Sequence, residues 1–301
     1  MYIYKEQLQR LVDESSQHSV AKRSGINQAV LSKYLHENYD GKIDELNDKI
    51  SAFLSKEARK SHFWKDVRVV DTNVKKEMIS AMQITHAMLR FGVVNGPAGI
   101  GKSTAIEEYR EQNRATTVLI KGSPVCKSVA GVITLIYEAI FKQVMTLSPR
   151  NANSMICQKL MASEWMILVD EAQEFVNDAF EQLRSIYDTT GCAVMLIGTP
   201  ELMNRLTNPR TGTILQQVRS RIPIIRTFGV EPIENDVKLI CNAYSINDKQ
   251  IIKRLQQRGG SGGLRTVSDC IRMARFLSNG RQLTIEDIIN AEKLADDDNQ
   301  E

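Results

Sequence analysis

The sequence has no long apolar segment and no cysteine pattern. Its longest apolar runs span five to six residues, as at Trp165–Val169, whereas a helix that crosses a bilayer needs about 18–20. The first residues lack the apolar core of a signal peptide. The five cysteines include no Cys-x-x-Cys pair, and the four histidines all precede residue 90 without metal-ligand spacing. We therefore expect no membrane partner, disulfide framework or zinc site. The expected location is the bacterial cytoplasm, or the host cytoplasm if the gene belongs to a phage.

Charge is nearly balanced overall but unevenly distributed. The formal net charge is +3, yet five arginines and no acidic residue lie between Leu202 and Val230. Between Lys249 and Arg281, eight basic residues accompany Asp269 alone. Segregated positive charge of this kind suits a partner with a phosphate backbone. Solvated helix faces explain either stretch alone equally well.

Length and periodicity divide the 301 residues into three expected domains. In residues 1–60, apolar residues recur at helical spacing, and the polar, basic stretch Ser55–Lys65 is expected to be a linker. In residues 61–229, short apolar runs alternate with helical patterns, which predicts an α/β fold: a parallel sheet with helices on both faces. Residues 230–301 have a helical pattern throughout, which indicates a small C-terminal helical domain.

The elements expected within these domains follow from the same patterns. The expected strands are Phe91–Asn95, Thr117–Ile120, Trp165–Val169, Ala193–Gly198 and Ile222–Phe228. The expected helices between them include Lys102–Gln112, Ser128–Thr146 and Phe175–Thr189, the last ended by Gly191. The expected C-terminal helices are Asn235–Tyr244, Asp248–Arg258, Leu264–Leu277 and Ile285–Leu294. The glycine run Gly259–Gly263 separates two of them, and Thr284 with Asp287 predicts a capping box.

Residues 96–104 fit the phosphate-binding pattern G-x-x-x-x-G-K-[ST]. The segment follows an apolar strand and opens a helix, which is the context that this P-loop motif requires. Backbone N–H groups of the loop and the positive end of the helix surround phosphate oxygens. Lys102 is expected to reach the β- and γ-phosphates of ATP, Ser103 to bind Mg²⁺, and Thr104 to lie near the α-phosphate. The residues expected to bind the nucleotide here are Gly96, Pro97, Ala98, Gly99, Ile100, Gly101, Lys102, Ser103 and Thr104.

Two carboxylates end a second apolar strand, as in a Walker B element. Asp170 and Glu171 follow Met166–Val169 directly. Asp170 is expected to hold Mg²⁺ through water, and Glu171 to orient and polarise the water that attacks the γ-phosphate. An Asp-Glu pair is also a common start of a loop. Its position after a P-loop, across one helical layer, favours the catalytic interpretation.

Three further positions match functional residues of AAA+ ATPases: sensor 1, the arginine that acts on a neighbouring subunit, and sensor 2. With the P-loop and the Walker B element, they make the chain resemble that superfamily over about Phe63–Leu294. Thr199 follows a core strand, as sensor 1 does, and would bond the γ-phosphate or the attacking water; a plain Gly-Thr-Pro turn is the alternative. Arg221, or as second choice Arg219, precedes the last strand, as an arginine does that reaches a neighbouring subunit's γ-phosphate. Arg265 resembles the sensor 2 arginine of an AAA+ lid, which links lid position to the nucleotide state.

The segment Ser19–Leu35 resembles a helix-turn-helix. Ala21 lets two helices cross closely, Gly25 makes the turn, and apolar residues from Ile26 to Leu35 bury the second helix. Exposed amides can read base edges, and cations can contact phosphates. The expected DNA contacts are Asn27, Gln28, Ser32 and Lys33, with Lys22 and Arg23 on phosphates. A helical bundle that binds protein instead would produce the same pattern.

The order of helix-turn-helix, AAA+ core and basic helical end resembles the Mu B family of transposition ATPases, typified by the phage Mu B transposition protein (MuB). TniB-, TnsC- and IstB-type ATPases are more distant relatives. The resemblance implies slow, DNA-stimulated ATP hydrolysis and assembly into a ring or helical filament on double-stranded DNA, largely without sequence preference. It also implies target selection and stimulation of a transposase.

DNA contacts are expected in two further places. The loop after the second core strand often faces the central channel of AAA+ assemblies, which suggests Lys121 and Lys127, with Lys253, Arg254 and Arg258 of the basic end as auxiliaries. These would be phosphate contacts without sequence information. An ATP-regulated transcriptional regulator, a replication helicase loader and a secretion-associated ATPase share parts of the pattern and are the alternatives.

Overall fold

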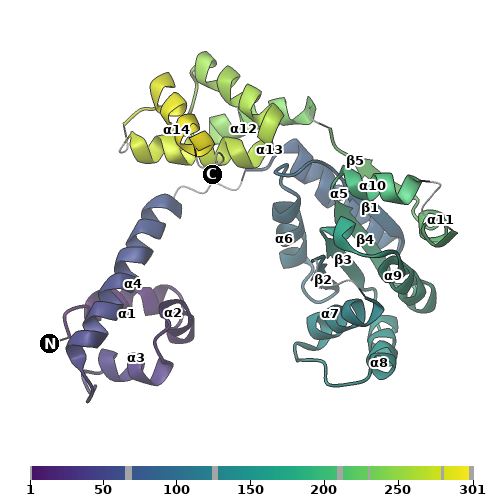
Figure 1. Ribbon diagram of the computed structural model, residues 1–301, viewed down its shortest axis with the longest axis horizontal. Coiled ribbons are helices and arrows are strands. Elements are labelled where there is room, and N and C mark those ends of the chain that lie inside the picture. The colour runs from purple at the N-terminus through teal and green to yellow at the C-terminus, as the bar shows by residue number, and fades with distance from the viewer. Residues whose placement is uncertain are drawn as a thin grey trace. The chain divides into compact units, whose positions relative to one another are not determined.

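The computed structural model describes residues 2–64, 70–123, 128–208, 213–229, 231–278 and 281–297. The chain divides into two compact units, Met1–Arg68 and Val69–Glu301 (Figure 1). The expected division of the chain into domains 1–60, 61–229 and 230–301 stays a prediction.

Four helices make up the described part of the first unit. They are α1 (Lys5–Glu14), α2 (Gln17–Ser24), α3 (Gln28–Leu35) and α4 (Ile43–Trp64). Leu8, Val20, Leu31 and Ile50 are fully buried between them. The turn between α2 and α3 passes through Gly25, whose φ of 68° lies in the left-handed region that favours glycine. These helices agree with the helical spacing found in residues 1–60, whereas the interpretation as a DNA-binding helix-turn-helix stays a prediction.

The expected linker at Ser55–Lys65 is wrong over most of its length. Helix α4 continues through this stretch to Trp64, and Lys65 lies outside the described residues. The stretch is rich in lysine, arginine, glutamate and alanine, which are good helix formers, and it contains neither glycine nor proline. Polarity alone therefore did not end the helix.

The second unit is built on a five-stranded parallel sheet in the order β2-β3-β4-β1-β5. The strands are β1 (Phe91–Asn95), β2 (Thr117–Lys121), β3 (Met166–Asp170), β4 (Ala193–Gly198) and β5 (Ile224–Thr227). Every residue of β1, β3 and β4 is buried, as expected of parallel strands covered on both faces. The five expected strands are confirmed, with ends that differ by at most two residues.

Helices cover both faces of this sheet, which confirms the expected α/β AAA+ architecture (Figure 1). One apolar cluster joins the sheet to α5 (Asn73–Ala87), α6 (Lys102–Gln112) and the C-terminal helices. The other joins it to α7 (Val129–Phe141), α8 (Pro149–Met161), α9 (Asn177–Thr190), α10 (Pro200–Thr207) and α11 (Thr213–Arg219). A short 3-10 turn, η1 (Ala172–Glu174), follows β3. Helix α7 ends earlier than expected, because Lys142 adopts a left-handed φ of 57°.

The C-terminal helices are α12 (Glu231–Ala243), α13 (Lys249–Leu277) and α14 (Ile285–Asp297). The glycine run separates two helical stretches, as expected, but the break is confined to its last residue: the first stretch continues to Gly262, and only Gly263 departs from helical geometry. The missing side chain of Gly259 lets its backbone approach Val237 and Ile233 closely, and this packing holds the helix together. The capping box is confirmed, since Asp287 Oδ2 accepts from Thr284 N at 2.8 Å. Within the described parts of the chain, no helix is long and apolar enough to cross a membrane.

Candidate functional site

The P-loop joins the carboxyl end of β1 to the start of α6. Gly99 and Gly101 have φ values of 79° and 97°, so the loop needs glycine at both positions. Lys102 is only 7% exposed, and its Nζ donates to the carbonyl oxygens of Gly96 and Pro97, both at 2.8 Å. Burial lowers the pKa of Lys102, while the charges of the two carboxylates that end β3 oppose that shift. A buried cation held in a glycine loop suits a polyphosphate ligand.

Asp170 and Glu171 lie at the end of β3, beside this loop. Asp170 is 6% exposed, and its Oδ1 accepts from Glu171 N at 3.0 Å. Burial raises the pKa of Asp170, and the charge of Glu171 adds to the shift, whereas Lys121 and Lys102 oppose it. Carboxylate and hydroxyl oxygens are the ligands that Mg²⁺ prefers, so Asp170, together with Ser103 on the first turn of α6, fits a Mg²⁺ site.

The residue after β2 is hydrogen-bonded to the backbone at the end of β3. Lys121 is exposed and stands opposite Asp170 in the sheet, and Gly122 N donates to Asp170 O at 2.8 Å. A Cβ on Gly122 would lie 2.2 Å from Glu171 O, so only glycine allows this approach. Lys127, the other expected DNA contact of this loop, lies outside the described residues.

Thr199, the expected sensor 1 residue, follows β4 and begins α10. Its backbone N donates to Gln173 Oε1 at 3.2 Å, and Gln173 Nε2 donates to Glu171 Oε2 at 2.6 Å. Sequence reasoning missed Gln173, because only the pairing of β3 with β4 brings it to Thr199. It also missed Asn95, the last residue of β1, whose buried Oδ1 has no hydrogen-bond partner among the described residues. A polar residue at the end of a buried strand was the available signal for Asn95.

The C-terminal helices contact the P-loop where α13 breaks. Arg265 N donates to Gly99 O at 3.0 Å. Gly263 has φ 76° and ψ −177°, and a Cβ there would lie 2.7 Å from Ala98 O. The Arg265 side chain is exposed and near enough for its charge to lower the pKa of Lys102 further. Arg265 therefore lies at the phosphate-binding loop, as a sensor 2 arginine would.

The two arginines expected to act on a neighbouring subunit lie elsewhere. Arg221 Nε donates to Asp188 Oδ1 at 2.7 Å, and Arg219 Nη1 donates to Ile222 O at 3.4 Å. Both arginines precede β5, which is parallel to β1, whereas the P-loop follows β1. They therefore lie at the opposite edge of the sheet from the P-loop of the same chain.

Most of the expected N-terminal DNA contacts have partners within the unit. Asn27 Oδ1 caps α3 by accepting from Ala29 N at 2.8 Å, and Lys33 Nζ lies 3.1 Å from Asp40 Oδ1. Gln28 Oε1 lies 3.3 Å from His18 Nδ1, and Arg23 Nη2 donates to Ser15 Oγ at 3.2 Å. Lys22 is exposed and Ser32 is half-buried. Their roles as DNA contacts stay predictions.

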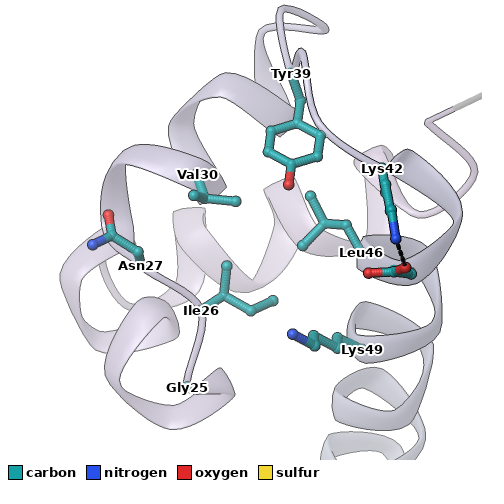
Figure 2. A pocket seen from close by; sticks show the side chains of 9 residues that line it. Gly25, Ile26, Asn27, Val30, Tyr39, Lys42, Leu46 and Lys49 are labelled. Atoms are coloured by element: carbon teal, nitrogen blue, oxygen red, sulfur yellow. Dashed lines mark hydrogen bonds and ion pairs between the residues drawn. The ribbon is translucent and has the colours of Figure 1, made fainter.

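A cavity of about 350 Å³ lies between the α2–α3 turn and α4. Figure 2 shows Ile26, Val30 and Leu46 facing it from three elements, with Lys49 at its rim. Lys42, also on the rim, is paired with Glu45 at 2.7 Å. Asn27, one of the residues expected to read bases, also lines the cavity, which therefore adjoins the start of α3.

The expected auxiliary contacts of the basic end differ in their surroundings. Lys253 is exposed. Arg254 Nε donates to Glu292 Oε2 at 2.7 Å, an ion pair that joins α13 to α14. Arg258 is half-buried. Lys253 therefore presents its charge to solvent as a phosphate contact requires, while the Arg254 side chain is 42% exposed but paired with Glu292.

Two family models match the chain. The AAA domain model matches residues 88–206, and the model named "Mu B transposition protein, C terminal" matches residues 220–294. The "ATP-dependent target DNA activator B" of Escherichia phage Mu is 25% identical over 273 residues, which cover 89% of this chain and 86% of that protein. The "Mu-like prophage FluMu DNA transposition protein B" of Haemophilus influenzae is 26% identical over 256 residues, which cover 82% and 87%.

Two solved structures share the fold. The ORC2 protein of Aeropyrum pernix superposes with a TM-score of 0.56 and 12% identity, covering 77% of this chain and 70% of that one. A Walker-type ATPase of Pyrococcus abyssi superposes with a TM-score of 0.50 and 14% identity, covering 77% and 74%. With the P-loop, the paired carboxylates and the parallel sheet order, these likenesses lead to one conclusion. The chain is an AAA+ P-loop ATPase that is similar to the Mu B transposition proteins over most of its length.

Proposed function

We propose that the chain assembles on double-stranded DNA in an ATP-dependent manner, selects target DNA and stimulates a transposase. The observation that carries the proposal is the similarity, over 89% of the chain, to a phage protein named as an ATP-dependent target DNA activator. The match of residues 220–294 to the Mu B C-terminal model supports it separately from the ATPase core.

The ATP site supplies the switch in this proposal. Lys102 would exchange its two carbonyl partners for the β- and γ-phosphates, and Ser103 with Asp170 would hold Mg²⁺. When bound, Mg²⁺ neutralises phosphate charge and so favours transfer of the γ-phosphoryl group. Glu171 would orient the attacking water, and Thr199 would bond that water or the γ-phosphate. Arg265 would make the position of the C-terminal helices depend on the nucleotide.

The place of Arg221 supports assembly. Because Arg221 lies at the far edge of the sheet from its own P-loop, it can complete only the ATP site of another copy. ATP held between two copies would then stabilise their contact, and hydrolysis would weaken it. This arrangement makes the nucleotide a regulator of a homo-oligomer, either a ring or a filament.

The DNA would bind close to the catalytic carboxylates. Lys121 is exposed, and the hydrogen bond from Gly122 to Asp170 ties its loop to the end of β3. A phosphate contact at Lys121 would therefore be felt at Asp170 and Glu171, which gives DNA a route to stimulate hydrolysis. Contacts of this kind carry affinity without sequence information.

The test combines nucleotide and DNA binding. Lys102→Ala removes the buried cation and should weaken ATP binding about 10- to 100-fold. It should also abolish ATP-dependent binding to two unrelated DNA duplexes, measured with a fluorescent ATP analogue and labelled DNA across a salt series. The exposed Lys76→Ala serves as the matched control. Unchanged ATP affinity would remove the P-loop assignment. Tight binding to one duplex alone would instead favour a transcriptional regulator.

A further inference from the structure

We propose that Gln173 is a positioning residue for ATP hydrolysis, which holds the Glu171 carboxylate with one end of its side-chain amide and the end of β4 with the other. The inference rests on the proposed role of Glu171 as the carboxylate that orients water. It adds a residue that the P-loop, Walker B and sensor patterns do not contain.

The two hydrogen bonds fix the orientation of the amide. A backbone N–H can only donate, so the atom 3.2 Å from Thr199 N must be the Gln173 oxygen. The amide nitrogen then faces the Glu171 carboxylate, which can only accept when ionised, at 2.6 Å. A flipped amide would break both contacts. The donor and acceptor of one side chain therefore match the two groups that face it.

The backbone of Gln173 is held in place by Arg205. Its carbonyl oxygen accepts from Arg205 Nη1 at 2.5 Å, and Arg205 Nη2 donates to Asn177 Oδ1 at 3.0 Å. The guanidinium also lies 5.4 Å from the centre of the Phe180 ring, a cation–π contact. These contacts join η1, α9 and α10, so the side chain of Gln173 projects from a fixed point.

The Gln173 side chain fits closely against Gly198 at the end of β4. A Cβ on Gly198 would lie 2.7 Å from Gln173 Oε1, so the amide can reach the end of β4 only because residue 198 is glycine. Gly198 has no left-handed φ to explain it. The close approach of the Gln173 amide gives one reason for glycine at this position.

This link has a consequence for catalysis. Glu171 adopts a left-handed φ of 51°, and its carboxylate oxygen is held by Gln173. Positioning within a fraction of an ångström governs how well a carboxylate orients water, and a 1 Å error can cost about 100-fold in rate. Since the same amide binds Thr199 N, a shift at the end of β4 would move Glu171 as well. The sensor 1 position and the catalytic carboxylate would then respond together.

Gln173→Met tests the inference, because methionine has similar length and volume but lacks the amide donor and acceptor. We expect kcat to fall about 10- to 100-fold, while KM and ATP affinity stay within about twofold of the parent values. In the nucleotide-free protein, the Thr199 amide hydrogen should exchange faster, because it loses its acceptor. The exposed Gln257→Met is the control and should change neither. Gln173→Asn, one methylene shorter, should behave like Gln173→Met, which covers the case that methionine disturbs folding.

A double variant separates the possible failures. If Gln173 acts through Glu171, Glu171→Gln combined with Gln173→Met should be no slower than Glu171→Gln alone. Losses that multiply, or an unchanged kcat with unchanged Thr199 exchange, would overturn the role of Gln173. Normal hydrolysis by the single variant Glu171→Gln would instead show that the proposed role of Glu171 is wrong, and the inference about Gln173 would fall with it.

Discussion

Two buried side chains of opposite charge, Lys102 and Asp170, lie at the candidate ATP site, and burial shifts the pKa of each. Burial lowers the pKa of Lys102 and raises the pKa of Asp170, so each group is pushed toward its neutral form. Neither charge forms a direct ion pair with the other among the described contacts. A site prepared for phosphates and a cation therefore holds charges that destabilise the nucleotide-free protein.

Asp170→Asn should separate stability from activity. The folded pKa of Asp170 lies above its unfolded value, so the native state binds more protons between the two, and stability falls as pH rises through that window. Once ionised, the buried carboxylate costs stability, and asparagine removes that cost. We expect the Tm of the nucleotide-free variant to rise by about 2–4 °C for each kcal/mol recovered, while ATP hydrolysis is lost.

Thermal melts at pH 7 and at a pH well below the ordinary pKa of an aspartate carboxyl check this expectation. The gain should shrink at the lower pH, where the parent carboxyl is protonated in both states. The exposed Asp48→Asn is the control and should change Tm little at either pH. A lower Tm for Asp170→Asn at pH 7 would show that the buried carboxylate stabilises the protein.

At the residue scale, the sequence was enough to predict the motif residues but not the residues that hydrogen-bond to them. Lys102, Asp170, Glu171 and Thr199 could be named because a local pattern carries each of them, and the structure brings all four to one edge of the sheet. The partner Gln173 could not be named in this way, because its contact with Thr199 depends on which strands are neighbours.

Among the elements, α13 makes the most specific contact with the site. The helix runs from Lys249 to Leu277 with one non-helical residue, Gly263. At that residue the backbone meets the P-loop, and Arg265 N donates to Gly99 O. The P-loop also needs glycine at this contact, since a Cβ on Gly99 would lie 2.8 Å from Gly262 O. The C-terminal helices therefore contact the phosphate-binding loop directly, through glycine backbones.

Gly263→Ala should therefore weaken both folding and ATP binding. Alanine strongly disfavours φ 76° with ψ −177°, at a cost of about 1–3 kcal/mol, and its Cβ would collide with Ala98 O. Gly260→Ala, an exposed position with helical geometry in the same helix, should instead stabilise by about 0.5–1 kcal/mol. Melting curves and ATP titrations of the two variants decide the matter. Equal behaviour of both variants would argue against a contact that requires glycine.

The type of element could be predicted more reliably than its end. The strands could be located because each is a short, continuous apolar run, as at Met166–Val169. One boundary was misplaced, at Ser55–Trp64, because polarity alone does not stop a helix that its residues favour. The glycine run indicated the break at Gly263, whereas the contact of that residue with the P-loop joins segments far apart in the sequence and has no local pattern.

At the scale of the whole molecule, the parallel sheet separates the proposed catalytic arginine from the P-loop of its own chain. The P-loop, Asp170 and Glu171 follow the carboxyl ends of their strands, while Arg221 precedes the amino end of β5. One chain cannot bring these groups together without unfolding the sheet between them. Two copies in head-to-tail contact can, and repeating that contact gives a ring or a filament.

Mixing two inactive variants tests this arrangement. Arg221→Ala keeps the carboxylate but lacks the arginine, and Glu171→Gln keeps the arginine but lacks the carboxylate. We expect each alone to bind ATP and to lose DNA-stimulated hydrolysis. In a random 1:1 mixture, about a quarter of head-to-tail interfaces would join an intact Glu171 to an intact Arg221, so partial activity should return.

The control must separate the arginine's role between copies from its ion pair within the chain. Arg221 and Asp188 are both about one-third exposed, and such pairs contribute only about 0–1 kcal/mol, so Arg221→Ala should fold normally. Asp188→Asn removes this ion pair, and the one between Asp188 and Arg184 as well, but keeps Arg221, and it should keep DNA-stimulated hydrolysis. If Asp188→Asn is as inactive as Arg221→Ala, the ion pair explains the loss. If the mixture stays inactive at every ratio although the variants co-assemble, Arg221 does not act on a neighbouring site.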